Sequence, residues 1–192
     1  MNRMASSGKG SKVKGSKYEL DIAKKLAAWS GEQVHRVPQS GAGGSTWGAD
    51  SRMNGDIVFP VGSKNSFVYE CKKREGWGLH NLFLGTGQVK EWWEQVVTDS
   101  RRMKEHGMAP CLIFSKNRDK DYILIPYIPA IYEFLLVNGH PAAIQRVSFD
   151  NIRKEPQYFD VILTTLEGFT AFDPTFLFDS YRDLNWDVHN KE

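Results

Sequence analysis

Three charged side chains stand at positions where neighbouring strands could bring them together. Asp56 follows Gly55 at the start of one apolar run. Glu70 and Lys72 flank Cys71 at the end of the next run. Side chains alternate between the two faces of a strand, so Glu70 and Lys72 share one face and Cys71 points to the other. If the two runs form a hairpin, Asp56 lies beside Glu70, and two carboxylates converge with one lysine.

This set of groups suits metal-assisted hydrolysis of a phosphodiester. Mg²⁺ prefers oxygen ligands, so Asp56 and Glu70 are expected to hold one ion, with the backbone carbonyl of Cys71 and water completing the shell. Mn²⁺ is expected to substitute. Lys72 would orient the attacking water or stabilise the developing negative charge, and Glu19 is a candidate third carboxylate. The alternative is an ordinary ion pair of Glu70 and Lys72 on a solvated strand.

Hydrophobic periodicity predicts the elements that position these residues. The expected helices are 16–29, 86–106 and 130–137. The expected strands are 34–38, 56–61, 66–73, 109–115 and 122–127, followed by a hairpin of 159–165 with 169–172. Trp92 and Trp93 are expected in the core, because their spacing fits the buried stripe of the second helix. This order predicts an α/β fold with a mixed central β-sheet flanked by helices.

The 192 residues are expected to form one folded core with additions at both ends. Residues 1–14 contain glycine, serine and lysine with little to bury, and they are expected to form a flexible basic arm. The core is expected over 15–127. Residues 128–192 are expected to be a C-terminal extension packed on this core, with possible contacts to DNA or to a second subunit.

Charge is distributed unevenly along the chain. Residues 1–74 carry 13 basic and 6 acidic side chains, whereas residues 75–192 carry 12 basic and 17 acidic ones. The N-terminal part is therefore expected to face a polyanion such as DNA, with Lys12, Lys14 and Lys17 as contacts, although lysines on a solvated tail are the competing interpretation. Trp47, in a glycine-rich loop, is a further candidate for contact with DNA or a second subunit.

Several classes of protein are not expected. No apolar run is long enough to cross a membrane, and no signal peptide is recognised. The two cysteines argue for free thiols in a reducing compartment, that is, a cytoplasmic location. The glycine-rich segments lack the lysine of a phosphate-binding loop and the third glycine of a dinucleotide site, so no nucleotide cofactor is expected.

Four motifs occur in a recognisable order. They are a Lys-Gly turn before an early glutamate at 14–19, Arg-x-Pro-x-Ser-Gly at 36–41, Asp56 at a strand start, and Glu-x-Lys at 70–72. In this order they resemble the PD-(D/E)xK nuclease superfamily, and within it the archaeal-type Holliday junction resolvases, including those encoded by viruses. The resemblance implies a restriction-endonuclease-like fold and a role in DNA recombination and repair, in a prokaryotic cell or a virus-infected host cell.

The resemblance also implies a role for each matching residue. Glu19, Asp56 and Glu70 would serve the metal centre, Lys72 the nucleophilic water, and Arg36 and Ser40 the phosphate. Gln88 is a possible further residue near the metal, with Gln95 as the competing candidate. Paired cuts in a four-way junction imply a two-fold homodimer. Two alternatives stay open: another PD-(D/E)xK endonuclease that cuts duplex or flap DNA, and a non-catalytic DNA-binding module.

Overall fold

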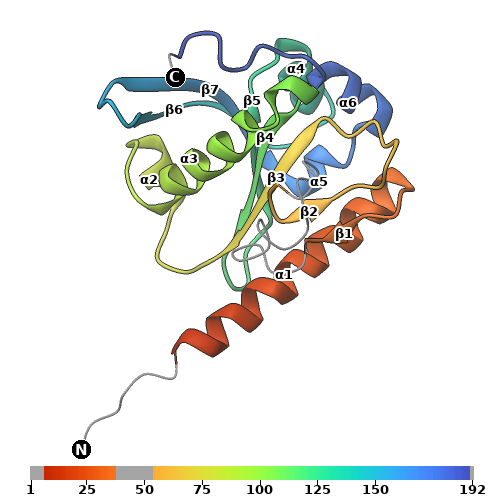
Figure 1. Ribbon diagram of the computed structural model, residues 1–192, viewed down its shortest axis with the longest axis horizontal. Coiled ribbons are helices and arrows are strands. Elements are labelled where there is room, and N and C mark those ends of the chain that lie inside the picture. The colour runs from red at the N-terminus through yellow and green to blue at the C-terminus, as the bar shows by residue number, and fades with distance from the viewer. Residues whose placement is uncertain (1–6, 38–53, 191–192) are drawn as a thin grey trace, which may run out of the picture.

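A five-stranded mixed β-sheet forms the centre of the structure, a computed structural model that describes residues 7–37 and 54–190 (Figure 1). Its strand order is β3-β4-β5-β7-β6. The first two neighbours are parallel and all later neighbours are antiparallel. The strands are β3 (Phe67–Lys73), β4 (Ala109–Ser115), β5 (Tyr122–Pro126), β6 (Ala142–Asp150) and β7 (Pro156–Thr165). The predicted α/β class with a mixed central sheet is confirmed.

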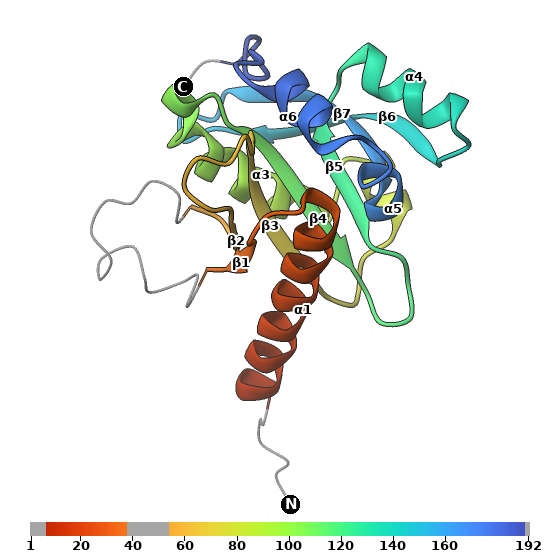
Figure 2. The same cartoon turned by 90° about the vertical axis from the view of Figure 1, so that its right-hand side faces the viewer.

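Helices cover both faces of this sheet (Figures 1 and 2). One face packs against α1 (Ser7–Ser30), α4 (Pro129–Val137), α5 (Leu166–Phe169) and α6 (Pro174–Tyr181). The other face packs against α2 (Leu79–Phe83) and α3 (Gln88–Arg101), which a 3₁₀ turn (Lys104–His106) follows. Trp92 and Trp93 of α3 lie in this second core, as their spacing predicts. None of the described helices combines the length and apolar character needed to cross a membrane.

Helix α1 begins at Ser7, so the expected start near residue 16 is wrong. The expected arm over residues 1–14 is correspondingly helical from Ser7 onward, while residues 1–6 lie outside the described part. The apolar stripe of Tyr18, Ile22 and Leu26 is buried against the sheet. Periodicity detects only turns that bury such a stripe, and before Tyr18 this helix offers a single large apolar residue, Val13, which is exposed. The earlier turns of the helix propagate from the packed part.

The predicted hairpin of 56–61 with 66–73 does not form as a ladder. Instead, β1 (His35–Arg36) pairs antiparallel with β2 (Ile57–Val58) in a small separate sheet. The segment that leads into β2 meets β3 through a backbone hydrogen bond, from Asp56 N to Tyr69 O at 2.7 Å. Just before it, Gly55 has a φ of +84°, and an added Cβ would lie 2.4 Å from the Tyr69 carbonyl oxygen. Only glycine permits this close approach.

The C-terminal third of the chain completes the sheet. β7 pairs with β5 on one side and with β6 on the other. The expected extension over 128–192 is therefore continuous with the core, and the expected hairpin of 159–165 with 169–172 is wrong. Thr165 ends β7 and caps α5 by accepting from Gly168 N at 3.2 Å, so helix replaces the second predicted strand. β6 was not predicted, because apolar and polar residues do not alternate regularly along it.

Candidate active site

Asp56 and Glu70 are buried carboxylates that meet at β3, which ends the strand order of the sheet in the described part of the chain. Asp56 is 5% exposed and Glu70 is 2% exposed. The Asp56 Oδ2 atom accepts from Cys71 N at 2.8 Å, while Asp56 N donates to Tyr69 O at 2.7 Å. These two contacts lie on either side of Glu70 along β3. They hold the Asp56 carboxylate next to Glu70, as the sequence predicts, although by another route than a hairpin ladder.

Lys72 shares the α3 side of β3 with Glu70. Val68 belongs to the core beneath α3, whereas Tyr69 and Cys71 belong to the core beneath α1, as alternation along a strand predicts. Lys72 Nζ forms an ion pair with Glu70 Oε1. The Lys72 side chain is 21% exposed, so its ammonium group lies at the border between the buried carboxylates and solvent.

The electrostatics of this pair favour a bound cation. Burial, and next the charge of Asp56, raise the pKa of Glu70 from its ordinary 4.5 to about 8, against the opposing effect of Lys72. Ionisation of Glu70 beside the Asp56 carboxylate is thus disfavoured unless a cation compensates the second negative charge. Two buried carboxylates supply the oxygen ligands that a hard divalent ion prefers. Among the described residues no group of three or more His, Cys, Asp or Glu suited to a metal occurs, and the fit rests on this pair.

Glu19 and Arg36 form a second pair next to the first. Arg36 Nε, on β1, donates to Glu19 Oε2, on α1, at 2.5 Å. The charge of Glu19 contributes to the raised pKa of the Cys71 thiol, after burial, Asp56 and other groups, which places Glu19 in the neighbourhood of β3. The structure therefore pairs Glu19 with Arg36 and does not gather it with both other carboxylates.

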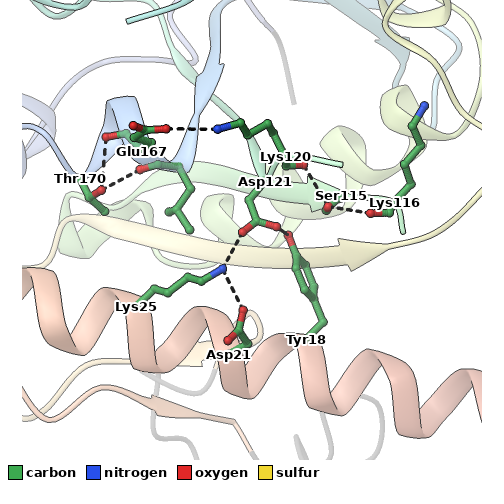
Figure 3. A network of polar contacts seen from close by, with 10 residues as sticks. Tyr18, Asp21, Lys25, Ser115, Lys116, Lys120, Asp121, Glu167 and Thr170 are labelled. Carbon is green, nitrogen blue, oxygen red and sulfur yellow. Dashed lines mark hydrogen bonds and ion pairs between the residues drawn. The ribbon is translucent and has the colours of Figure 1, made fainter. Parts of the chain in front are cut away.

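A polar network fixes the position of α1, and with it Glu19 (Figure 3). Tyr18 OH donates to Asp121 Oδ1 at 3.0 Å, at the start of β5. Lys25 Nζ reaches Asp121 Oδ2 at 2.8 Å and Asp21 Oδ2 at 2.9 Å. These contacts anchor two successive stretches of the helix to the sheet. Glu19 lies between Tyr18 and Lys25 in the sequence, so its place near β3 depends on Lys25 and Asp121, which lie outside the motif at 14–19.

The other predicted site residues fall in different places. Lys14 and Lys17 are exposed on α1. Gln88 is half-buried at the first position of α3, while Gln95 is exposed on the same helix. Ser40, Trp47 and the side chain of Lys12 lie outside the described residues.

Asp99, on α3, is a site residue that sequence reasoning missed. Its charge contributes to the raised pKa of Glu70, and Lys72 in turn lowers the pKa of Asp99, although burial raises it overall. Asp99 also forms an ion pair with Arg102 Nη1 at 2.8 Å. Asp99 stands seven positions, about two helical turns, after the buried Trp92, so it lies on the helix face toward the sheet. This spacing is the sequence feature from which its place could have been predicted.

Asp56, Glu70 and Lys72, from two of the four sequence motifs, meet at the edge of β3. The chain belongs to the phage putative PDDEXK endonuclease family, which it matches over residues 10–179. It is 29% identical to protein D14 of Escherichia phage T5 over 134 residues, 68% of this chain and 79% of that protein. The resemblance to PD-(D/E)xK nucleases seen in the sequence is confirmed.

A comparison with solved structures also finds the 1.6 Å structure of Archaeoglobus fulgidus Hjc, a Holliday junction resolvase from an archaeal hyperthermophile. The match covers 86% of this chain and 96% of that one, with a TM-score of 0.36 and 14% sequence identity.

The raised pKa of Glu70 predicts a pH-dependent stability of the metal-free protein. Between pH 4.5 and about 8 the folded protein keeps a proton on Glu70 that the unfolded chain has released, so stability falls as pH rises through this window. Glu70→Gln, which mimics the protonated acid, is expected to flatten the decline by on the order of 3 kcal/mol. Denaturant titrations in a chelator from pH 5 to pH 9 measure this.

Glu94→Gln, which changes an exposed glutamate on α3, is the matched control and is expected to keep the wild-type decline. An equal decline in the Glu70→Gln variant would contradict the assignment of this titration to Glu70.

Cys71→Ser is expected to lower stability without impairing the site. The thiol is buried beneath α1, and a hydroxyl there costs about 1–2 kcal/mol if it finds no partner. The backbone N–H that holds Asp56 is unchanged. The free energy of unfolding should fall, while DNA cleavage per folded molecule stays within about twofold of wild type. A much larger loss of cleavage would show that the Cys71 side chain itself serves the site.

Proposed function

We propose that this chain is a Mg²⁺-dependent DNA endonuclease that resolves four-way junctions by paired phosphodiester hydrolysis. The observation that carries the proposal is the buried pair of Asp56 and Glu70 with Lys72 beside it. Membership of a PDDEXK endonuclease family supports the nuclease chemistry. Selectivity for junctions is supported by the order of the four motifs in the sequence.

The metal ligands of this proposal are the Asp56 and Glu70 carboxylates and the carbonyl of Cys71. The N–H and C=O of one strand residue point to the same side of the strand, and Cys71 N points to Asp56. Its carbonyl therefore faces the same side as the Asp56 carboxylate. When bound, Mg²⁺ supplies a water of lowered pKa and offsets charge on the scissile phosphate. Mn²⁺ presents a similar preference for oxygen ligands and is expected to replace it.

Lys72 acts on the attacking water and on the phosphate. Its ion pair with Glu70 keeps the ammonium group beside the carboxylates, and its partial exposure lets it reach a substrate in solvent. There it can donate a hydrogen bond to the attacking oxygen and stabilise the negative charge that develops.

Arg36 is proposed to bind a phosphate near the scissile bond. A guanidinium can hold a phosphate through two parallel hydrogen bonds. Its present partner is Glu19, which would be released as a third carboxylate for the metal centre when Arg36 turns to DNA. Further DNA contacts are proposed for Ser40, Trp47 and Lys12, and Gln88 remains a candidate near the metal.

Paired cuts also require two centres, so the proposal includes a two-fold homodimer. Of the aromatic residues near the C-terminus, Phe172 and Phe178 are buried in their own core and give this dimer no apolar surface, while Phe176 is half-exposed. Recombination and repair of phage DNA in the cytoplasm of an infected cell would be the setting. The phage family and the free, buried Cys71 and Cys111 support this setting.

A substrate panel tests the function. A four-way junction, a flap and a plain duplex of matched sequence are incubated with the protein, with Mg²⁺ or with chelator. Symmetric paired cuts in the junction, dependent on Mg²⁺, are the expected result. Equal cutting of duplex or flap would instead make the protein a general PD-(D/E)xK endonuclease, and binding without any cut would reject the catalytic proposal.

Basic residues on α1 are expected to contribute to DNA affinity. Lys14→Gln and Lys17→Gln together should weaken binding and reduce the slope of log affinity against log salt by up to about one per lost phosphate contact. Cleavage at saturating DNA should change little. Lys64→Gln, in the turn before β3 and at the opposite end of that strand from Lys72, is the control. A slope equal to that of wild type in the double variant would mean that these lysines are only solvated.

A further inference from the structure

Among the described strands, β6 forms an edge of the central sheet. It lies at the end of the strand order opposite to β3, and among the described strands it pairs only with β7 (Figure 1). Its nine residues pair continuously with β7, without a bulge. Long regular edges are normally blocked by bulges, prolines or lysines, or are covered by another segment. No proline or lysine occurs within β6, so this edge is open to another strand.

Exposed apolar side chains flank this edge on both faces of the sheet. α2 and α4 each contact β6, and they belong to the cores on opposite faces. The exposed large apolar residues on or next to these three elements are Leu79, Phe83, Leu84, Leu136, Val137 and Ile144. A group of this kind around an open strand is typical of an interface between proteins.

We infer that β6 pairs antiparallel with β6 of a second copy of this chain, centred on Ser148. A two-fold axis perpendicular to the sheet places one residue opposite itself and pairs the residues on either side of it. With Ser148 at the centre, Arg146 lies opposite the partner's Asp150, and Val147 lies opposite the partner's Phe149. The first is a pair of opposite charges, and the second joins a β-branched residue to an aromatic one. Both kinds of pair are favourable across neighbouring strands.

Neighbouring registers are less favourable. Centring on Arg146 places two arginines opposite each other, which is repulsive. Centring on Val147 places Ile144 opposite the partner's Asp150, which pairs an apolar side chain with a carboxylate and leaves the charge of Asp150 without an opposite charge across the strands. Charge and apolar complementarity in β6 thus favour the register centred on Ser148. A second copy of this chain is the partner, because its own β6 provides the matching charged and apolar residues.

This register fits the contacts that β6 already makes. Arg146 donates to both carboxylate oxygens of Asp160 on β7, at 2.8 and 2.9 Å, so the partner's Asp150 would place a second carboxylate on its other side. Val147 and Phe149 are buried in the core beneath α3, and their pairing would continue that core across the interface. Ile144 would lie near the turn that follows the partner's β6, which carries the partner's Ile152, a residue that is fully exposed in the single chain.

The interface would make the proposed pair of cuts possible, and in that respect it rests on the proposed function. The axis perpendicular to the sheet keeps the same face of both copies on one side. The two β3 strands would form the outer edges of one continuous sheet, roughly 40 Å apart at about 4.8 Å per strand spacing. Both catalytic centres would then be presented on the same face to one branched DNA molecule.

Cysteine crosslinking tests the register. Residues opposite each other in an antiparallel pair have Cα separations that a disulfide can span, so Ser148→Cys should form a covalent dimer within minutes of mild oxidation at low micromolar concentration. Ile144→Cys, more exposed but far from its own copy across the axis, should crosslink at least about tenfold more slowly. The native Cys71 and Cys111 are buried and should not interfere. Faster crosslinking of Ile144→Cys, or none by Ser148→Cys, would overturn the inference.

The mass in solution tests the charge pair. Wild type is expected to be a dimer by light scattering, and Asp150→Lys, on an exposed residue, should raise the dimer dissociation constant at least about tenfold. Asp179→Lys, exposed on α6, is the control and should remain dimeric. A monomeric wild type, or an unaffected Asp150→Lys dimer, would overturn the interface. These readouts need no DNA, so they can fail or succeed separately from the nuclease activity.

Discussion

Asp56→Asn and Glu70→Gln are each expected to reduce DNA cleavage by about a thousandfold or more while DNA binding survives. Each substitution keeps the size of the side chain and removes one of the two carboxylates that would hold Mg²⁺. Neither removes a basic group, so affinity for DNA should be unchanged or higher, because less negative charge faces the phosphates. Cleavage of a labelled junction at saturating protein, together with a binding titration in Ca²⁺ or chelator, measures both quantities.

The matched control for this experiment is Glu94→Gln on α3. It removes one carboxylate charge from an exposed position and should leave cleavage within about twofold of wild type. Glu70→Gln should also remain folded, since it mimics the protonated acid that burial favours. Activity within tenfold of wild type in both site variants would show that these carboxylates do not form the catalytic centre.

Lys72→Met is expected to reduce cleavage by about a hundredfold or more, with DNA binding retained. The methionine keeps most of the aliphatic stem but removes the ammonium group that would contact the attacking water. Lys72 also lowers the pKa of Glu70, so its removal should leave Glu70 protonated to a higher pH and weaken Mg²⁺ binding near neutrality. Single-turnover rates at several Mg²⁺ concentrations measure this loss.

Raising the pH separates the two roles of Lys72. If the lysine acted only through Glu70, cleavage by Lys72→Met would recover at pH 9 with excess Mg²⁺, because Glu70 would then be ionised. A direct role predicts that the defect persists. Lys73→Met, at the adjacent exposed position near the Tyr18 ring, controls for the loss of one positive charge and should keep nearly full activity. Full recovery at high pH would reject the direct role.

Much of the candidate active site could be predicted from short stretches of sequence. Alternation along β3 determines that Glu70 and Lys72 share a face, and the Gly55-Asp56 pair marks the point where a second segment can approach β3 closely. Both features depend on geometry within a few residues. The order of the four motifs was likewise sufficient to indicate the nuclease class that the family match confirms.

What the tertiary structure alone decided depends on residues far apart in the chain. The pairing of Glu19 with Arg36, the position of Asp99 beside Lys72, and the insertion of β7 between β5 and β6 each join distant segments. Local periodicity shows which side of a helix or strand is buried, but it does not show against which neighbour that side packs. Strand order and ion-pair partners depend on how the whole core packs. Each strand or charged side chain could contact several partners, and only the folded core determines which of these contacts can form together.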